Sequence, residues 1–271
     1  MPAKFGQNFL VSGNIAQKMA RVAEVTSEDT VLEIGPGKGI LTTALLKTGA
    51  KVIAVEKDFK LFNFLKQKFE PFILSNHLTL ISADIRDLLT PQSAKSLALG
   101  KITKVVANIP YYLTGRLLRL LLDPEATSRK LRITSLTLML QKEVAERLAP
   151  AKSLALGKNS LLAVSVRVFA EPKIAFYVKK GNFQPQPKVD SAVILLKKRE
   201  KDFFKEHKIS QGDFFDAVKA GFAHPRKLLK NNLKMSNTGC LTRCGVGEKV
   251  RAEDLSLENW ACVTRFIHRE K

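Results

Sequence analysis

Short runs of β-branched residues alternate with helical patterns through the first half of the chain. Each run has the length of a buried strand, and the segment after it has apolar residues every three or four positions. Strands that alternate with helices in this way form a largely parallel sheet with helices on both faces. The sequence therefore predicts an α/β, Rossmann-like fold. The predicted strands are 30–35, 51–56, 78–84 and 103–108, and the predicted helices are 15–23, 40–49, 59–69 and 115–122.

The pattern changes twice in the second half. Three further strands with short connections predict an antiparallel edge of the sheet. The charged connector KKREKDFFKEHK follows, and beyond it only helical patterns occur. We therefore expect an α/β domain at 1–199 and a helical domain at 200–271. The three later strands are predicted at 131–140, 160–169 and 191–198, with a helix at 141–149.

The octapeptide AKSLALGK occurs twice, at 94–101 and at 151–158. Both copies fall between predicted elements, which suggests a duplicated loop segment, and the repeat is too short for a repeat architecture. The second copy, with Lys152 and Lys158, could also be a basic loop that contacts RNA.

Three glycines in LEIGPGKGILT lie where a predicted strand passes into a helix. Gly35, Gly37 and Gly39 allow a tight turn and a close approach of the backbone to a ligand. The dinucleotide fingerprint is G-x-G-x-x-G, whereas the spacing here is G-x-G-x-G with isoleucine at position 40. This favours S-adenosylmethionine, which has no pyrophosphate to bind.

Acidic residues end the next two predicted strands. Glu56 ends VIAVE, where a carboxylate can accept both ribose hydroxyl hydrogens, and Asp84 ends LTLISAD, where it can accept from an adenine amino group. A single acid at a strand end is often only solvated. Ligand-type residues at three successive strand ends are seldom accidental, so we expect S-adenosylmethionine as the cofactor.

The segment VVANIPYYLT places an amide, a proline and two tyrosines at the end of a strand. Pro110 cannot donate to a sheet ladder, so the strand stops at the edge where open α/β sheets bind ligands. The pattern fits methylation of an exocyclic base amine such as adenine N6. The Asn108 side-chain oxygen and the Ile109 carbonyl would accept its hydrogens, and Tyr111 would stack on the extruded base. A plain strand terminator would explain the proline, but not the asparagine and tyrosine beside it.

The chain carries 45 Lys and Arg against 25 Asp and Glu, a formal net charge of +20. Such a field attracts polyanions, nucleic acid first and an anionic membrane surface second. Four basic residues near the C-terminus recur at helical spacing and could form a phosphate-binding stripe, with a solvated helix face as the alternative. These residues are Arg226, Lys227, Lys230 and Lys234.

No run of about 18 apolar residues occurs and the N-terminus lacks a signal-peptide core, which predicts a cytoplasmic protein without membrane attachment. Cys240, Cys244 and Cys262 are then expected to be free thiols. With His268 they could in principle bind zinc, but the spacing matches no familiar site, so we expect no metal.

Taken together, these motifs resemble the ribosomal RNA adenine N6,N6-dimethyltransferases, which modify adjacent adenosines near the 3′ end of 16S rRNA. The similarity runs nearly end to end, and NIPY combined with F-x-P-x-P-K-V-D-S-A-V is its most specific part. The matching segments are FGQNFL (5–10), EIGPGKG (33–39), VEKD (55–58), SADIRD (82–87), NIPYY (108–112), MLQKEVAERL (139–148), FQPQPKVDSAV (183–193), RKLLKNNL (226–233) and RAEDLS (251–256).

This resemblance implies a methyltransferase catalytic domain at 1–199 and an rRNA-recognition domain at 200–271. It implies a role in ribosome biogenesis, with 16S rRNA of the small ribosomal subunit as the partner. Phe183 is expected to face the target base across from Tyr111, which would form a stacking clamp. The donor-binding residues that the resemblance implies are Asn8, Leu10, Gly35, Glu56, Asp84 and Asn108.

Three other functions share some of these features. A relative that methylates one 23S rRNA adenine and confers macrolide resistance has the same catalytic motif, but RAEDLS and RKLLKNNL resemble the small-subunit type. In a DNA adenine methyltransferase the F-x-P-x-P segment and the helical tail would have no role. A non-catalytic assembly factor would be expected to have lost at least one of Gly35, Glu56, Asp84 and Asn108. Nothing in the sequence indicates an obligate interface, so we expect a monomer.

Overall fold

The computed structural model describes residues 8–89, 101–110, 113–126, 132–149, 159–235 and 239–269. By its contacts the chain divides into two compact units, one made of 1–145 and 171–198 and the other of 146–170 and 199–271. Residues 146–170 thus group with the C-terminal helices, whereas the sequence-based division placed them in the catalytic domain. The copies of AKSLALGK, with Lys152 and Lys158, lie outside the described residues except for Lys101.

A seven-stranded sheet forms the centre of the first unit. Its strands are β2 (Thr30–Ile34), β3 (Lys51–Glu56), β4 (Leu78–Ser82), β5 (Lys104–Asn108), β6 (Ser135–Gln141), β7 (Ala170–Val178) and β9 (Ser191–Lys198). They lie in the order β4-β3-β2-β5-β6-β9-β7. β2 to β6 pair in parallel, and β9 runs antiparallel to β6. The predicted parallel sheet and the antiparallel strand at 191–198 are therefore confirmed, whereas the strand predicted at 131–140 as part of the antiparallel edge instead extends the parallel strands by its pairing with β5.

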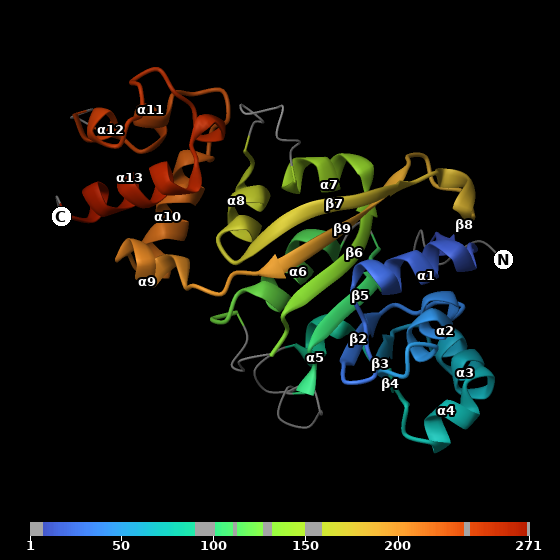
Figure 1. Cartoon of the computed structure of the whole chain (residues 1–271). Coiled ribbons are helices and arrows are strands. Elements are labelled where there is room, and N and C mark those ends of the chain that lie inside the picture. The colour runs from blue at the N-terminus through green and yellow to red at the C-terminus, as the bar shows by residue number, and fades with distance from the viewer. Residues whose placement is uncertain are drawn as a thin grey trace. The chain divides into compact units, whose positions relative to one another are not determined.

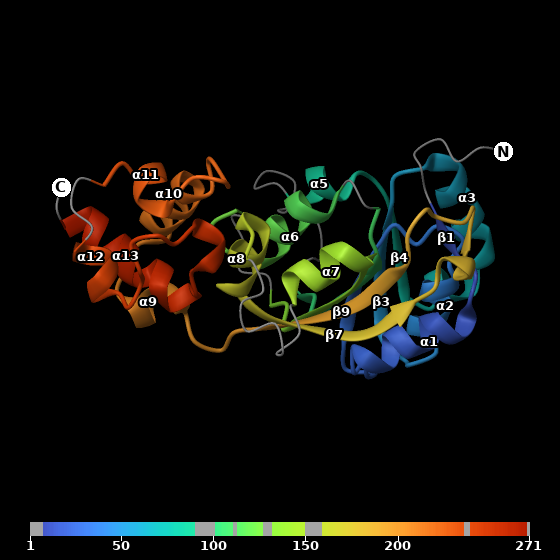
Figure 2. The same ribbon diagram turned by 90° about the horizontal axis from the view of Figure 1, so that it is seen from above.

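Helices cover both faces of this sheet, with α1 and α2 on one side and α6 and α7 on the other (Figures 1 and 2). The helices of this unit are α1 (Gly13–Val22), α2 (Ile40–Leu46), α3 (Phe59–Lys68), α4 (Glu70–Leu74), α5 (Ile85–Leu88), α6 (Thr114–Leu122), the start of α7 (Lys142–Leu148) and the 3-10 turn η3 (Lys180–Asn182). Side chains begin several of them. The Asp58 carboxylate, for example, accepts the N–H groups of Lys60 and Leu61 at 2.8 and 3.1 Å and so starts α3 directly after β3.

A separate two-stranded sheet joins the N-terminal segment to a late one. β1 (Phe9–Leu10) pairs antiparallel with β8 (Phe183–Gln184), with Leu10 opposite Phe183. The Val11 N–H extends the pairing by donating to the Asn182 carbonyl at 2.9 Å. The QNFL motif and the F-x-P-x-P motif, far apart in the sequence, are therefore direct neighbours.

The strand predicted at 160–169 is wrong, because Leu161–Arg167 form helix α8. The Ser160 hydroxyl accepts the Ala163 N–H at 3.2 Å and caps the helix. A short apolar run cannot be assigned to helix or strand by periodicity alone. The strand of this region is β7, which tolerates Pro172 because it lies at the edge of the sheet.

The second unit is helical around an apolar core in which Phe214 and Trp260 are fully buried. Cys244 and Cys262 form a disulfide, so the prediction of free thiols is wrong for these two residues. No helix in the described ranges is long and apolar enough to cross a membrane, and no three of their Cys, His, Asp or Glu side chains group as a metal site. The elements of this unit are α8, α9 (Phe203–His207), α10 (Gln211–Gly221), α11 (Leu229–Asn232), α12 (Gly239–Arg243), η4 (Ala252–Asp254) and α13 (Leu257–Arg269).

Candidate active site

The loop between β2 and α2 follows a path that requires glycine. Gly35, Gly37 and Gly39 have φ angles of +67°, +59° and +77°. A Cβ on Gly37 would lie 2.9 Å from the Phe9 ring, and one on Gly39 would lie 2.5 Å from the Phe69 ring. Side chains are thus excluded at positions 37 and 39, and the loop lines a cavity at the carboxyl edge of the sheet.

Glu56, at the end of β3, connects this loop to the start of α3. Its carboxylate accepts the Gly37 N–H at 3.1 Å and the Asp58 N–H at 2.9 Å. The side chain is buried, and burial raises the pKa of its carboxyl above the usual value. The acid that was predicted to bind a ribose therefore also fixes the position of the glycine loop.

Asp84 follows β4 and caps α5 by accepting the Arg86 N–H at 2.9 Å. The Arg86 guanidinium also binds both of its oxygens, at 3.0 and 2.6 Å, and the Lys57 ammonium lies 3.0 Å away. Arg86 therefore holds the pKa of Asp84 well below its usual range. The carboxylate is ionised, and a nucleobase amino group that approached it would share its oxygens with Arg86.

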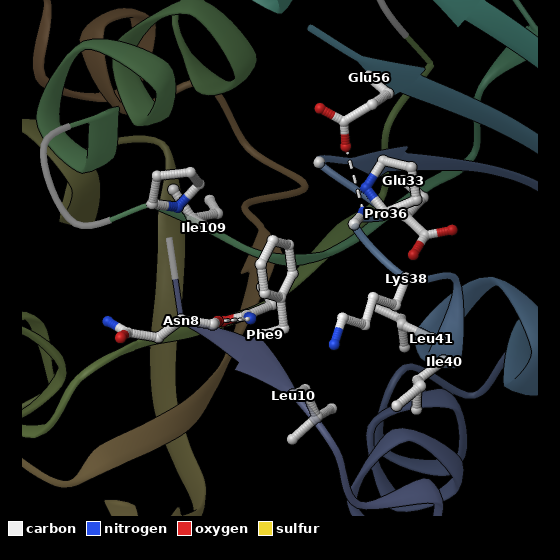
Figure 3. Close-up of a pocket in the computed structure, with 14 residues that line it drawn as sticks. Asn8, Phe9, Leu10, Glu33, Pro36, Lys38, Ile40, Leu41, Glu56 and Ile109 are labelled. Atoms are coloured by element: carbon white, nitrogen blue, oxygen red, sulfur yellow. Dashed lines mark hydrogen bonds between the residues drawn. The ribbon is translucent and has the colours of Figure 1, made fainter. Parts of the chain in front are cut away.

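Two adjoining cavities lie along the carboxyl ends of the parallel strands. They share Gly35, Glu56 and Pro110 in their walls, so they lie next to each other, and together they are called the trough below. One end takes in Asn8, Leu10, Asn108 and Ile109, and the other takes in Asp84. Figure 3 shows the first end, where the Phe9 ring projects from β1 into the space between Ile109 and the glycine loop. Every donor-binding residue implied by the resemblance lines this trough.

Asn108 ends β5 and has a fixed orientation. Its Nδ2 atom donates to the backbone carbonyl of Asn8 at 3.3 Å. A carbonyl can only accept, so the amide nitrogen must face Asn8 and the Oδ1 atom must point elsewhere. The next residue, Ile109, donates its N–H to the Met139 carbonyl at 3.3 Å and is itself buried.

Of the two residues in the predicted stacking clamp, the structure describes Phe183 but not Tyr111. Tyr111 lies outside the described residues, so its position stays a prediction. Phe183 is in β8, where its ring is 5% exposed and packs in the core of the first unit with Leu10. The ring lines neither end of the trough. Its role opposite the target base also stays a prediction.

Glu33 is a site residue that the sequence reasoning missed. It lies in β2, lines the trough, and is 1% exposed. Neither carboxylate oxygen has a hydrogen-bond partner of ordinary geometry, and burial raises the pKa to about 8. A charged residue between leucine and isoleucine in a buried strand was the available signal. Phe9 and Lys38 also line the trough, and the Lys38 ammonium lies 5.5 Å from the centre of the Phe9 ring.

The four basic residues of the second unit do not lie along one helix, so the predicted helical spacing is wrong. Only Lys230 is in α11, which spans four residues, and its ammonium lies 3.8 Å from Glu248. Arg226 and Lys227 are exposed in the turn before α11, and Lys234 is exposed after it. Contact of these four residues with RNA stays a prediction.

Comparisons with the sequences of known proteins identify one family. The family model described as "Ribosomal RNA adenine dimethylase" matches residues 2–269. A protein of Dehalococcoides mccartyi is 36% identical over 262 residues, which cover 94% of this chain and 84% of that protein. One of Listeria innocua is 39% identical over 275 residues, with coverage of 97% and 89%. Both are named Ribosomal RNA small subunit methyltransferase A.

Solved structures show the same fold. The 23S rRNA methyltransferase ErmE has a TM-score of 0.71 and 22% identity, with 96% of this chain and 100% of that chain covered. A dimethyladenosine transferase from Plasmodium falciparum has a TM-score of 0.70 and 22% identity, with coverage of 97% and 98%. At this identity the similarity establishes the architecture and leaves the choice of substrate to other observations.

Proposed function

Because the chain belongs to the ribosomal RNA adenine dimethylase family, we propose that it dimethylates N6 of adjacent adenosines near the 3′ end of 16S rRNA in the small ribosomal subunit. S-adenosylmethionine would supply the methyl groups. The protein would act as a cytoplasmic monomer during ribosome biogenesis. The contact between Asn108 and Asn8 carries this proposal, because it turns the amide oxygen of a residue that lines the trough away from Asn8 and leaves it to accept from a ligand.

The trough fits such a donor. Glu56 offers a buried carboxylate to ribose hydroxyls, next to a glycine loop that leaves room for close approach. Asp84 offers an ionised carboxylate at the far end, beside Ile85, where an adenine would lie. At the near end, Asn8 and Leu10 line the wall from β1. Glu56, where the two cavities meet, and Asp84, at the far end, would orient a long, polar ligand along the strand edge.

The catalytic work of the chain is positioning. An adenine N6 is a poor nucleophile because its lone pair is delocalised into the ring. Asn108 Oδ1 and the Ile109 carbonyl would accept the two N6–H hydrogens and favour a pyramidal nitrogen. No proton need leave before attack, so alignment supplies most of the rate. Pro110 fixes the backbone after Ile109, and Tyr111 is proposed to stack on the base.

The choice of the small subunit rests on the relatives that match most of the chain, all of which carry the small-subunit name in the comparison above. The RAEDLS segment, which suggested the same choice, builds a corner of the second unit. The Arg251 N–H donates to the Asp254 carboxylate at 2.8 Å, and the Asn159 amide donates to the Leu255 carbonyl at 2.7 Å. Methylation of 23S rRNA, the activity of the relative whose catalytic motif this chain shares, is the second candidate.

The test is transfer of labelled methyl groups to small subunits that lack the modification, followed by nucleoside mass analysis. Large subunits and the Asn108→Ala variant are run in parallel. N6,N6-dimethyladenosine in small subunits alone, lost with Asn108→Ala, is the expected result. Label in large subunits would instead indicate methylation of 23S rRNA, the activity of the macrolide-resistance type. Tight subunit binding without any label would identify a non-catalytic assembly factor.

A further inference from the structure

The orientation of Asn108 depends on a segment that is not part of the central sheet. Asn108 is held by the carbonyl of Asn8, and Asn8 leads directly into β1. Among the strands that the structure describes, β1 pairs with β8 and with none of the seven-stranded sheet. The position of β8 therefore helps to set the position of the Asn8 carbonyl.

β8 is held through the turn before it. The Val11 N–H donates to the carbonyl of Asn182, the last residue of the η3 turn. The first residue of that turn, Lys180, donates its N–H to the Asp190 carboxylate at 2.9 Å, and the Lys179 ammonium lies 3.4 Å from the same group. One carboxylate thus anchors the whole turn.

Asp190 is in turn fixed to the central sheet. It directly precedes β9, whose first residue, Ser191, lies opposite Gln141 of β6. Its own carbonyl accepts the Lys142 N–H at 3.0 Å. The hydrogen bond from the Lys180 N–H lowers the pKa of Asp190, so the acceptor is ionised at neutral pH.

We propose that Asp190 is a positioning residue for methyl transfer, which acts through the η3 turn and the β1–β8 pair to aim the Asn108 amide. The inference rests on the proposed function. Three hydrogen bonds, joined by the short backbone segments 180–182 and 8–11, connect the Asp190 carboxylate with Lys180, Asn182 with Val11, and the Asn8 carbonyl with Asn108. Leu10, which is expected to bind the methyl donor, and Phe183, which is expected to face the target base, lie opposite each other in the β1–β8 pair. Asp190 would therefore help to position both residues.

Three variants separate this role from a general effect on folding. Asp190→Ala removes the acceptor for the Lys180 N–H, whereas Asp190→Asn keeps an acceptor oxygen there. Lys179→Ala removes only the exposed ion pair. Asp202→Ala is the matched control, because Asp202 likewise accepts backbone N–H hydrogen bonds, in its case two, and lies near a lysine, but at the start of α9 in the second unit.

We expect Asp190→Ala to lower kcat on small subunits roughly 10- to 100-fold, since a misplacement of about 1 Å can cost that much. The KM for the donor should rise by a smaller factor than kcat falls, because Glu56 and Asp84 are untouched while Asn8 and Leu10, which also line the trough, shift with β1. Asp190→Asn, Lys179→Ala and Asp202→Ala should stay within about threefold of the wild-type kcat. Hydrogen exchange at the Val11 amide should accelerate in Asp190→Ala, while the Ile53 amide in the central sheet stays protected.

A wild-type kcat in Asp190→Ala would overturn the proposal, and so would equal losses in Asp190→Ala and Asp190→Asn. Faster exchange at both Val11 and Ile53 would also overturn it, because that would indicate general destabilisation. If the wild-type protein itself transfers no methyl group, the proposed function fails instead, and the exchange at Val11 still reports whether Asp190 anchors β1.

Discussion

The Glu56 carboxylate holds the glycine loop directly, with its Oε2 atom accepting the Gly37 N–H at 3.1 Å. Its other oxygen accepts the Asp58 N–H at 2.9 Å, and Asp58 caps α3. One buried side chain therefore ties together the loop after β2, the end of β3 and the start of α3. A ligand that binds Glu56 binds to a group whose position is already fixed.

Replacing Glu56 by glutamine should weaken both the fold and donor binding. Both carboxylate oxygens of Glu56 accept backbone N–H groups. In glutamine one of these positions is taken by an amide nitrogen, which cannot accept, so one backbone N–H loses its hydrogen bond. A buried unmet donor costs about 1–3 kcal/mol, which corresponds to a loss of roughly 10- to 100-fold in donor affinity if the loop shifts. Titration calorimetry with S-adenosylmethionine measures this. Glu70→Gln, on the exposed surface of α4, is the control, and equal affinities in the two variants would contradict the prediction.

Glu33 should make stability depend on pH in a window that an ordinary carboxyl would not reach. Its folded-state pKa is about 8 against a usual 4.5, so the folded protein keeps a proton that the unfolded chain releases. Stability contributed by this group is then complete below pH 4.5 and falls as the pH rises towards 8, by at most about 1.4 kcal/mol per pH unit.

The Glu33→Gln variant removes this titration without changing the size of the side chain. Urea unfolding between pH 5 and pH 9 should show the variant gaining stability over the wild type as the pH rises, with a plateau above 8. A constant difference across this range would mean that Glu33 is ionised in the folded protein. Donor binding should be measured in parallel, because Glu33 lines the trough.

The central strands could be predicted because a strand that is buried on both faces of the sheet consists of a short run of apolar residues. Val52 to Val55 are all buried, and so is the same kind of run in β2 and β5. The segment 160–169 has a similar run of apolar residues but forms α8, in which Val164 packs in the core of the second unit. Its surroundings are set by residues elsewhere in the chain, which a local pattern does not contain.

The site shows the same limit. Gly35, Glu56, Asp84 and Asn108 could be placed together because the carboxyl ends of parallel strands share one edge. The β1–β8 pairing could not be predicted, since residues 10 and 183 are far apart in the sequence and a local pattern does not show that they meet. Glu33 was missed for a related reason: its neighbours in sequence are apolar, and only the fold shows that it borders the trough.

Gly39→Ala should be strongly destabilising. Its φ of +77° costs an L-residue about 1–2 kcal/mol, and the new methyl group would overlap the Phe69 ring at 2.5 Å. Overpacking adds about 1–3 kcal/mol. Gly13→Ala is the control, since nothing lies within 4 Å of a Cβ there and its φ is not in the left-handed region. Thermal unfolding should separate the two variants, and similar midpoints would contradict the described loop.

The disulfide between Cys244 and Cys262 should stabilise the second unit. It closes a loop with a sequence separation of 18 residues, for which the loss of chain entropy in the unfolded state is worth about 3 kcal/mol. Reduction and the Cys262→Ser variant should lower the unfolding midpoint by the same amount. Alkylation of the unfolded protein should label two more thiols after reduction than before it, and labelling of all three without reductant would show that the bond is absent.

Exposed cations around α11 should contribute an RNA affinity that falls as the salt concentration rises. Arg226, Lys227 and Lys234 are exposed, whereas Lys230 faces Glu248 and is left unchanged in this test. Each phosphate contact that is lost lowers the slope of log K against log salt concentration by about 0.7–0.9. Replacing all three residues by alanine should therefore flatten the slope by about 2 and leave donor affinity intact, because Glu56 and the trough belong to the other unit.

A triple variant in which Lys51, Lys60 and Lys66 are replaced by alanine controls for net charge. These lysines are exposed in the first unit, and their replacement removes the same number of positive charges. Binding of both variants to small subunits is measured at several salt concentrations. If the two slopes fall equally, the attraction comes from the overall charge of +20 and not from a local surface. If only the first slope falls, the exposed residues around α11 meet phosphates directly, and the second unit contributes affinity that the catalytic trough does not supply.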